Sequence, residues 1–573
     1  MKLIRVNMTD QTVQVEDVPQ QYAGLGGRGL TSVMIDAEVP PQCDPLGPEN
    51  KLILAPGLLS GTPLVNTGRI SIGAKSPLTG GIKESNSGGK IATSLGKLGI
   101  TAIVVEGRSP AGTLGMLVID PSGNAVLKDA SALKGMRTYA LSAKLLQDFG
   151  PKNTVACIGP AGELQLASAS IQTTDVDDRP CRAAARGGLG AVMGAKGLKA
   201  VVVSTEGKNA DAIADPEAFK EAAKAIAQSI QKNPFTGQML PALGTAGILG
   251  GVNALGAFPS YNATKGVFDG WEKISGEALA KRMQERGGKT KHMGCSQCII
   301  HCSNEYVDEK GAYVTSSLEY ETIWSMGGMI GVDDLDTIAQ LDFLCDDIGL
   351  DTINTGVAMA VAMDAGHKPF GDGAAAIAMV EEVALGTDFG KILGNGPVAV
   401  GKHFNHHRVP AVKGQSIAAY DPRAMQGLGV TYATSTMGAD HTAGNLLGLY
   451  LAGALKPLEP EGQADASRVA QITMAALDCI GLCILAGGVV ASAKGREAMT
   501  RMLSAKLGQE MAPDAISAMG VRILQAEKGF NTKAGLTAKD DRLPRFFYEE
   551  PLPPHNTVFT VTDADLDKVY TFR

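Results

Sequence analysis

Three cysteines stand close together in the middle of the chain, in the stretch KHMGCSQCIIHCSN. Cys295, Cys298 and Cys302 follow a C-x2-C-x3-C pattern, with His292 and His301 nearby. This spacing differs from that of a standard zinc knuckle and suits three corners of a four-iron four-sulfur cluster. Zinc with Cys3His coordination remains an alternative, because either histidine could complete the set. An iron-sulfur centre would need one further ligand from elsewhere in the chain.

Another thiol lies at the end of a motif that occurs twice. Residues 345–351 read CDDIGLD and residues 477–483 read LDCIGLC, so D-x-I-G-L is followed once by Asp and once by Cys. Each motif predicts an apolar helix that ends at a glycine in the left-handed conformation. A lone cysteine is usually a small buried hydrophobe. The paired motif instead favours Cys483 as the fourth ligand and predicts two equivalent loops around a shared object.

The same loops place carboxylates where helices end. Asp346, Asp351 and Asp478 lie at predicted helix C-termini, where the helix dipole disfavours negative charge unless a donor-rich partner compensates. They could be solvated carboxylates near turns. The sharper hypothesis is that they accept hydrogen bonds from the amino and ring N–H groups of a pterin.

Glycine and arginine gather in two segments of the first third of the chain. Arginine forks and bare glycine amides bind phosphate through bidentate hydrogen bonds and backbone nests, although each segment alone could be a turn. The candidates are Arg69, Lys75, Asn86, Gly88, Arg182, Arg186, Gly187 and Gly188. A formal G-x-G-x-x-G in GLGGRGL also raises a dinucleotide site, but no strand-helix-strand unit is predicted around it.

Composition indicates a soluble globular enzyme of several domains. The chain has 573 residues, 44% of them hydrophobic, and a net charge of −7, which argues against a dedicated nucleic-acid surface. Nine cysteines in short spacings fit ligands and buried thiols in a reducing compartment. No window suits a membrane-spanning helix, and the N-terminus has no export-signal pattern. We therefore expect a cytoplasmic protein without membrane or nucleic-acid partners.

The elements that must position these residues change character along the chain. Short β-type runs such as LIRVNM, TVQVEDV, KLILAPG, RISIGA, AIVVEG, GMLVID and KAVVVST fill the first third. Helical patterns then dominate, beginning where Asp215 can cap a helix with Pro216 in its first turn. Further helices are predicted from Ser275, over 333–347, over 352–364 and over 467–479.

The predicted fold class is α+β, with an N-terminal β-sheet platform followed by two mainly α-helical domains. The predicted boundaries are 1–205 for the platform, 206–410 for a helical domain with the cysteine run and the first paired loop, and 411–573 for a helical domain with His441 and the second loop.

Ten stretches in order give the chain a family resemblance. It resembles the tungsten-containing aldehyde ferredoxin oxidoreductases in GGRGL, KSPLTG, NSGG, ARGGLGAVMGAKGLKAVVV, GCSQCIIHC, LEYETIW, DDIGLD, AYDPRAMQGLGVTYATSTMGADH, DCIGLC and FFYEEPLPPHN. These stretches cover nearly the whole chain.

The resemblance implies a tungsten held by two molybdopterin dithiolenes between the platform and the helical domains, with magnesium bridging the pterin phosphates. One [4Fe-4S] cluster would be bound by Cys295, Cys298, Cys302 and Cys483. The residues implied to hold phosphates and magnesium are Arg69, Asn86, Gly88, Arg182, Ala183, Arg186 and Gly187, and those implied to line the pterins are Asp346, Leu350, Asp351, Asp478 and Leu482.

The implied reaction oxidises an aldehyde to a carboxylate and passes electrons singly through the cluster to ferredoxin or an iron-sulfur partner subunit. Glu319 in SLEYET and His441 in GADHT are the predicted catalytic residues, since a carboxylate and an imidazole can shuttle protons near neutral pH. Glu321 is the close competitor, and Tyr420 is a further donor. Without the family motifs, a surface Glu and a core His would be the simpler interpretation.

One feature of some family members is missing. Their subunits are bridged by a metal bound to E-x-x-H pairs, and this sequence contains no E-x-x-H. A homodimer is therefore a weaker expectation, and a hetero-oligomer with smaller iron-sulfur subunits is an alternative. Two other functions stay open: a related tungstopterin oxidoreductase acting on an aromatic acyl thioester, and a zinc-stabilised scaffold without redox chemistry.

Overall fold

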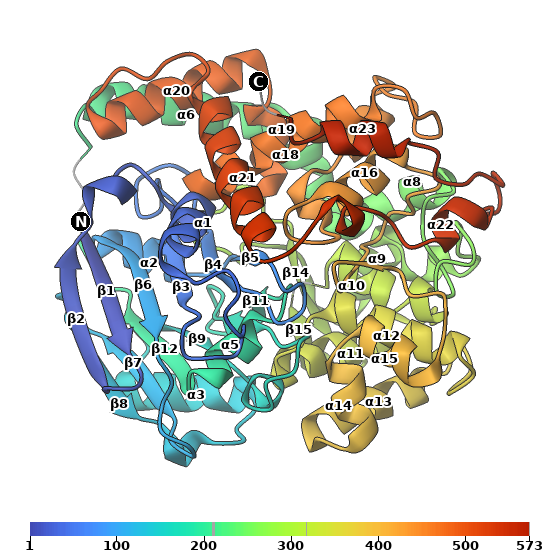
Figure 1. The fold of residues 1–573 in the computed structure, drawn as a ribbon, viewed down its shortest axis with the longest axis horizontal. Helices are drawn as coiled ribbons and strands as arrows, with labels where there is room; N and C mark the ends of the chain where they lie inside the picture. The colour runs from blue at the N-terminus through green and yellow to red at the C-terminus, as the bar shows by residue number, and fades with distance from the viewer. Residues whose placement is uncertain (209–212, 317, 572–573) are drawn as a thin grey trace.

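The computed structural model describes residues 1–208, 213–316 and 318–571. The N-terminal region holds two six-stranded sheets, and a largely helical part follows, so the α+β class is confirmed. In Figure 1 the strands gather on one side of the molecule, and most helices of the later chain cover the other side and the top. The predicted division of the helical part near residue 410 stays a prediction.

The first sheet has the order β2-β1-β6-β3-β4-β5. Its β1–β6 pair is parallel and the other neighbours are antiparallel. The elements of this half are β1 (Lys2–Asn7), β2 (Thr12–Asp17), α1 (Gly27–Glu38), β3 (Leu52–Pro56), β4 (Ile70–Lys75), β5 (Ile82–Ser87), α2 (Ile91–Lys97) and β6 (Ile100–Glu106). The formal G-x-G-x-x-G segment lies at the start of α1 but follows an antiparallel hairpin, so it does not belong to a dinucleotide-binding unit.

The second sheet repeats this plan in the order β11-β10-β9-β12-β7-β8. Only β7–β12 is parallel, as β1–β6 is in the first sheet. Its elements are β7 (Gly115–Ile119), β8 (Ala125–Asp129), α3 (Thr138–Phe149), β9 (Asn153–Cys157), α4 (Pro160–Glu163), β10 (Ile171–Thr173), β11 (Arg182–Ala184), α5 (Leu189–Ala195) and β12 (Leu198–Ser204). The two sheets therefore share one topology, which occurs twice in the platform. This repeat was not predicted from the sequence.

The seven predicted strands are all present, but five other strands of the platform were not predicted. The β5 sequence IKESNS is polar although five of its six residues are buried, because Lys83, Glu84 and Asn86 meet polar groups inside the protein. A strand with a polar interior lacks the apolar alternation on which prediction relies.

The predicted helices have the expected caps. Asp215 accepts a hydrogen bond from the Ala218 N–H at the start of α6 (Pro216–Lys232), and Ser275 does the same for Ala278 at the start of α9 (Gly276–Arg286). The other predicted helices are α11 (Leu335–Ile348), α12 (Thr352–Asp364) and α18 (Gln463–Ile480).

A small sheet interrupts the helical part around the cysteine run. It consists of β13 (Lys289–His292), β14 (Ser303–Val307) and β15 (Tyr313–Ser316), so the run is a loop between two antiparallel strands. The remaining elements are α7 (Leu240–Leu243), α8 (Leu249–Ala254), α10 (Tyr320–Ser325), α13 (Gly373–Leu385), α14 (Asp388–Gly394), α15 (Pro397–Phe404), β16 (Ala411–Val412), β17 (Gln415–Ser416), α16 (Gln426–Thr434), α17 (Leu447–Leu451), α19 (Gly487–Val490), α20 (Ala493–Leu507), α21 (Ala515–Lys533), α22 (Phe546–Glu549) and α23 (Asp563–Lys568).

Helices of the later chain pack directly on each half of the platform. α1 contacts α18 and α21, while α3 contacts α11. A buried bidentate ion pair joins α1 to α21, with Arg28 Nε and a terminal nitrogen each 2.9 Å from a carboxylate oxygen of Glu527. In the described residues, no helix combines the length and apolar character needed to cross a membrane.

Candidate functional site

The two D-x-I-G-L loops each dock on one half of the platform. Both helices end at a glycine in the left-handed conformation, Gly349 with φ 80° after α11 and Gly481 with φ 84° after α18. The N–H groups of Leu58 and Leu59 donate to the carbonyls of Cys479 and Ile480, both at 3.0 Å. On the other half, Ser170 N–H donates to Gly349 O and Asp351 N–H donates to Ser168 O, both at 2.9 Å. The predicted equivalence of the loops is thus visible in how they dock.

Glycines at two strand ends make this docking close. Gly57 follows β3, and a β-carbon added there would lie 2.1 Å from Gly481 Cα. Gly159 follows β9, and its added β-carbon would lie 2.2 Å from the carbonyl oxygen of Ile348. Backbone meets backbone at both places, so neither position has room for a side chain.

The four predicted cluster ligands lie in one region. Burial raises the pKa of Cys302, and the charges of Glu319, Cys483, Cys298 and Cys295 raise it further. Burial likewise raises the pKa of Cys298 to about 11, with Cys295 and Cys483 contributing. Cys483 therefore lies near the central run, although the two are far apart in the sequence. Four thiolates this close would repel one another unless a cation bound them. Their grouping therefore fits a metal cluster.

The nearby histidines have other surroundings. His292 Nε2 lies 2.6 Å from Asp177 Oδ2, which ties the start of the cysteine run to the platform. His301 donates its main-chain N–H to Cys298 Sγ at 3.3 Å. Cys483 therefore completes a set of four thiols more readily than either imidazole completes a zinc site.

Arg69 and Arg182 flank the cysteines. Arg69 Nε donates to Asn86 Oδ1 at 2.5 Å, and an added β-carbon at Gly88 would lie 2.4 Å from Cys295 Sγ and 3.2 Å from an Arg69 terminal nitrogen. Arg182 donates to Ser303 Oγ and lies 3.7 Å from Glu319 Oε1. Both guanidinium groups are positioned to bind an anion between the cysteine run and the platform.

A further arginine, Arg186, lies at the first paired loop, residues 345–351. Arg186 donates to the carbonyl oxygens of Ala439 and Ser416, at 3.1 and 2.7 Å, and its Nε lies 3.4 Å from Asp351 Oδ2. Gly187 has φ 86°, and a β-carbon there would lie 2.4 Å from Lys83 Cγ. Ala183 lies on β11 opposite Gln172.

Two aspartates of the paired loops, Asp346 and Asp478, have raised pKa values. Burial raises the pKa of Asp346 well above its ordinary value, with Asp342 adding and Arg182 opposing. Burial and the nearby Glu84 raise the pKa of Asp478 to about 8, although Arg28 opposes this. Leu350 and Leu482, in the same loops, are 1% exposed. The aspartates can form hydrogen bonds with a buried heterocycle, and the leucines can pack against it.

A carboxylate in the first turn of α10 lies next to an imidazole in the segment before α17, and each side chain is 15% exposed. His441 Nε2 lies 3.3 Å from Glu321 Oε1, and Glu321 Oε2 accepts the Ala419 N–H at 2.9 Å. Burial raises the pKa of Glu321, while His441 opposes the shift. The Tyr420 ring centroid is 6.1 Å from that of His441. This arrangement can move a proton between two groups that are largely, but not fully, shielded from solvent.

Glu319 lies apart from this pair. It caps α10 by position, accepts a hydrogen bond from Thr245 Oγ at 2.5 Å, and faces Arg182 and the cysteines. The structure therefore brings His441 together with Glu321 and not with Glu319. From sequence, Glu321 is only the competitor of Glu319, because both glutamates belong to the same SLEYET stretch.

Two further residues were missed. Tyr432 is fully buried and interacts electrostatically with Glu321 and Arg186, but it reads as an ordinary aromatic of α16. Asn66, in the loop before β4, contacts both cysteine segments. Its left-handed φ of 59° is a conformation that asparagine tolerates, so the VNTG stretch reads only as a turn.

The interior has the polar groups needed for a large bound heterocycle with phosphates. Within the described ranges, several buried side-chain atoms make no hydrogen bond, which costs about 1–3 kcal/mol for each unsatisfied group. They include Gln172 Oε1, Arg182 Nε, Arg186 Nε, Glu321 Oε1, Asp351 Oδ2, Tyr432 OH and His441 Nδ1. Donors and acceptors are both present and come from the platform, the first paired loop and the segments that carry Glu321, Tyr432 and His441. The residues present fit a bis-pterin cofactor.

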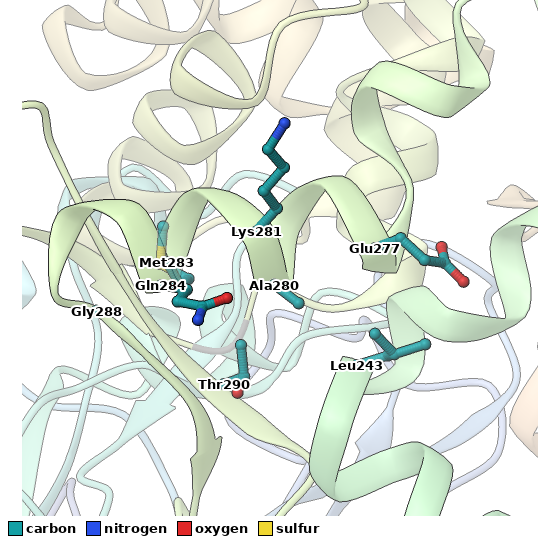
Figure 2. A pocket seen from close by; sticks show the side chains of 8 residues that line it. All are labelled: Leu243, Glu277, Ala280, Lys281, Met283, Gln284, Gly288 and Thr290. Carbon is teal, nitrogen blue, oxygen red and sulfur yellow. The ribbon is translucent and has the colours of Figure 1, made fainter.

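An open surface pocket of about 570 Å³ lies outside this interior, between α9 and β13. Figure 2 shows Lys281 and Glu277 extending from α9, with Thr290 and Leu243 on the opposite side. It contains none of the buried titratable groups described above. The candidate chemistry therefore belongs to the interior and not to this pocket.

Comparison with known proteins gives one consistent result. The family description "Aldehyde ferredoxin oxidoreductase, N-terminal domain" matches residues 3–205, and "Aldehyde ferredoxin oxidoreductase, domains 2 & 3" matches residues 221–573. The tungsten-containing aldehyde ferredoxin oxidoreductase of Thermococcus kodakarensis is 34% identical over 96% of this chain and 92% of its own. The WOR-like subunit of the aliphatic sulfonate oxidoreductase of Pyrococcus furiosus is 26% identical over 77% of this chain and 74% of its own.

A solved structure shares the fold. The active site complex BamBC of benzoyl coenzyme A reductase, in complex with 1,5 dienoyl-CoA, matches with a TM-score of 0.83 and 22% identity. The match covers 99% of this chain and 93% of that one.

Proposed function

This chain belongs to the aldehyde ferredoxin oxidoreductase family of oxidoreductases, as its motifs predicted, and on that premise we propose that it oxidises aldehydes to carboxylates with a tungstopterin. The balanced reaction converts RCHO and H2O into RCOO⁻, three protons and two electrons. The electrons leave singly through a [4Fe-4S] cluster to ferredoxin or an iron-sulfur partner subunit.

The residues that would hold the cofactor come from both halves of the platform and both paired loops. Arg69 and Asn86 from one half, and Arg182 and Arg186 from the other, would hold the pterin phosphates and their magnesium, together with the backbone of Gly88, Ala183 and Gly187. Asp346, Leu350, Asp351, Asp478 and Leu482 would line the pterins. When bound, the tungstopterin supplies the two-electron oxidation of the substrate carbon.

Proton handling is the task of Glu321 and His441 in this proposal. The Glu321 carboxylate takes a proton from the attacking water, because Oε2 is held by Ala419 N–H and Oε1 is left facing His441. The imidazole holds the carbonyl oxygen of the substrate by a hydrogen bond and passes a proton onward. Glu319, facing Arg182, would instead balance charge between the phosphates and the cluster.

One observation carries the proposal: a largely buried carboxylate and an imidazole 3.3 Å apart, near several buried polar atoms that make no hydrogen bond. The test is turnover by anaerobically purified protein on a panel of aliphatic and aromatic aldehydes, with a viologen dye or ferredoxin as electron acceptor. We expect acid formation and acceptor reduction in a ratio of one acid to two electrons. Inactivity on every aldehyde, together with turnover of a sulfonate or an aromatic acyl thioester, would show that the substrate class is wrong.

A further inference from the structure

Asn66 links the two segments that carry the four cysteines. It lies between β3 and β4, is 4% exposed and has a left-handed backbone with φ 59°. Its main-chain N–H donates to Gln297 O at 3.0 Å, and its carbonyl accepts the Cys483 N–H at 2.9 Å. One residue of the platform therefore touches both the central cysteine run and the distant fourth thiol.

The side chain of Asn66 reaches a cysteine sulfur. Its Nδ2 lies 3.5 Å from Cys298 Sγ, while its Oδ1 accepts the Ile299 N–H at 3.4 Å. The second contact fixes the orientation of the amide, because only the oxygen can accept that hydrogen bond. The NH2 group must then face the sulfur.

We propose that Asn66 is a positioning residue for the iron-sulfur cluster. Its main chain holds Cys483 next to the central cysteine run, and its side-chain amide donates an N–H···S hydrogen bond that raises the cluster's reduction potential. This inference rests on the cluster of the proposed function. Reduction adds negative charge to the cluster and its sulfur ligands, so a donor at a ligand sulfur stabilises the reduced form more than the oxidised form.

The side-chain donor of Asn66 to Cys298 Sγ can be removed by mutation. Cys298 Sγ receives a second hydrogen bond from the main-chain N–H of His301, which a side-chain substitution leaves in place. The structural task of Asn66 uses its main-chain groups, whereas the proposed electronic task uses its amide. The two can therefore be separated by variants that keep the left-handed backbone.

The test compares two variants of the anaerobically purified holoenzyme. Asn66→Asp has the same shape and keeps the acceptor for Ile299 but replaces the NH2 donor. Asn66→Gly is uncharged, suits the positive φ and keeps both main-chain contacts. Asn405→Gly is the matched control, because Asn405 is an exposed asparagine with a left-handed backbone, φ 49°, at the end of α15 and outside the cysteine segments.

The readout is the midpoint potential of the reduced cluster, followed by electron paramagnetic resonance, with iron content measured in parallel. We expect one-electron reduction to be about tenfold less favourable in Asn66→Asp, which is ~59 mV. Asn66→Gly should shift in the same direction by a smaller amount, and Asn405→Gly should match the wild type. A shift confined to the aspartate variant would mean that charge alone acts, and it would overturn the inference, as would no shift in either.

A measurement on the wild type decides the matter if the glycine variant loses iron. Protein labelled with ¹⁵N in the asparagine side-chain amide should show hyperfine coupling between ¹⁵N and the reduced cluster, and Asn66→Asp should lack it. Wild-type protein with a cluster but no such coupling would refute the role of Asn66. Wild-type protein with no cluster signal would instead refute the proposed function.

Discussion

His441 Nε2 lies 3.3 Å from Glu321 Oε1, while Glu319, two residues earlier, faces Arg182 at 3.7 Å. The separation follows from local structure, because Glu319 is the extended N-cap of α10 and Glu321 is in its first turn. The two carboxylates therefore leave the helix start in different directions. One meets the imidazole of the C-terminal part, and the other meets the platform and the cysteines.

Substituting Glu321 tests the proposed proton transfer. Glu321→Gln should lower kcat on aldehydes by about 10²–10⁴, the usual contribution of a general base, with tungsten and iron content unchanged. Glu319→Gln is the matched control and should keep kcat within about tenfold, since Glu319 is not in contact with His441. Loss of turnover in the Glu319 variant alone would assign the catalytic role to the other carboxylate.

The pH dependence of the rate gives an independent check. Burial raises the pKa of Glu321 above its ordinary value of 4.5, and the attraction of His441 offsets this only in part. Because the ionised carboxylate is the active form, kcat/KM should fall as the pH decreases through the raised pKa of Glu321. This acid limb should be absent in Glu321→Gln. A wild-type rate with the same acid limb as that of Glu321→Gln would be inconsistent with a general base at Glu321.

Cys483 should be required for the cluster although it lies far from the central run in sequence. Cys483→Ala should lose iron and the resonance signal of the reduced cluster, because three thiolates remain for four corners. Cys479→Ala is the control: Cys479 is fully buried next to Gly29, in a separate apolar contact. Full iron content in the Cys483 variant would require another fourth ligand.

Glycines at the strand ends should matter for stability and cofactor content. In Gly57→Ala and Gly159→Ala the new methyl group would lie 2.1 and 2.2 Å from backbone atoms of the paired loops. We expect each to destabilise the protein by about 1–3 kcal/mol or more and to reduce tungsten content, measured by thermal unfolding and metal analysis.

Gly529→Ala provides the matched control for these glycine variants. It lies within α21 with no atom within 4 Å of its added β-carbon, so it should stabilise the helix by up to ~1 kcal/mol. Equal behaviour of all three variants would contradict the docking described for Gly57 and Gly159.

Much of the architecture could be predicted because it follows local rules. The helix caps at Asp215 and Ser275 and the left-handed glycines of the paired loops are sequence-local features that the structure confirms. The polar strand β5 could not be predicted, because its polar side chains contact polar groups of other segments inside the protein, such as Asp440 and Arg69. The repeat of the platform was missed because it preserves strand order and pairing more than residue identity.

The same limit applies to the candidate site. Motifs indicate which segments carry chemistry, but the partner of each side chain depends on packing between distant segments. Sequence could not separate Glu319 from Glu321, because their different directions depend on where α10 begins. Nor could it identify Asn66, whose contacts with Gln297 and Cys483 join three regions of the chain.

Metal analysis of anaerobically purified protein tests the central claim most directly: thiols from two distant segments bind one iron-sulfur cluster beside a tungsten cofactor. Mass spectrometry of the metals should find about four irons per chain, with tungsten present in stoichiometric amount and the reduced protein giving a [4Fe-4S] resonance signal. Active protein that contains zinc, with neither iron nor tungsten, would contradict the account.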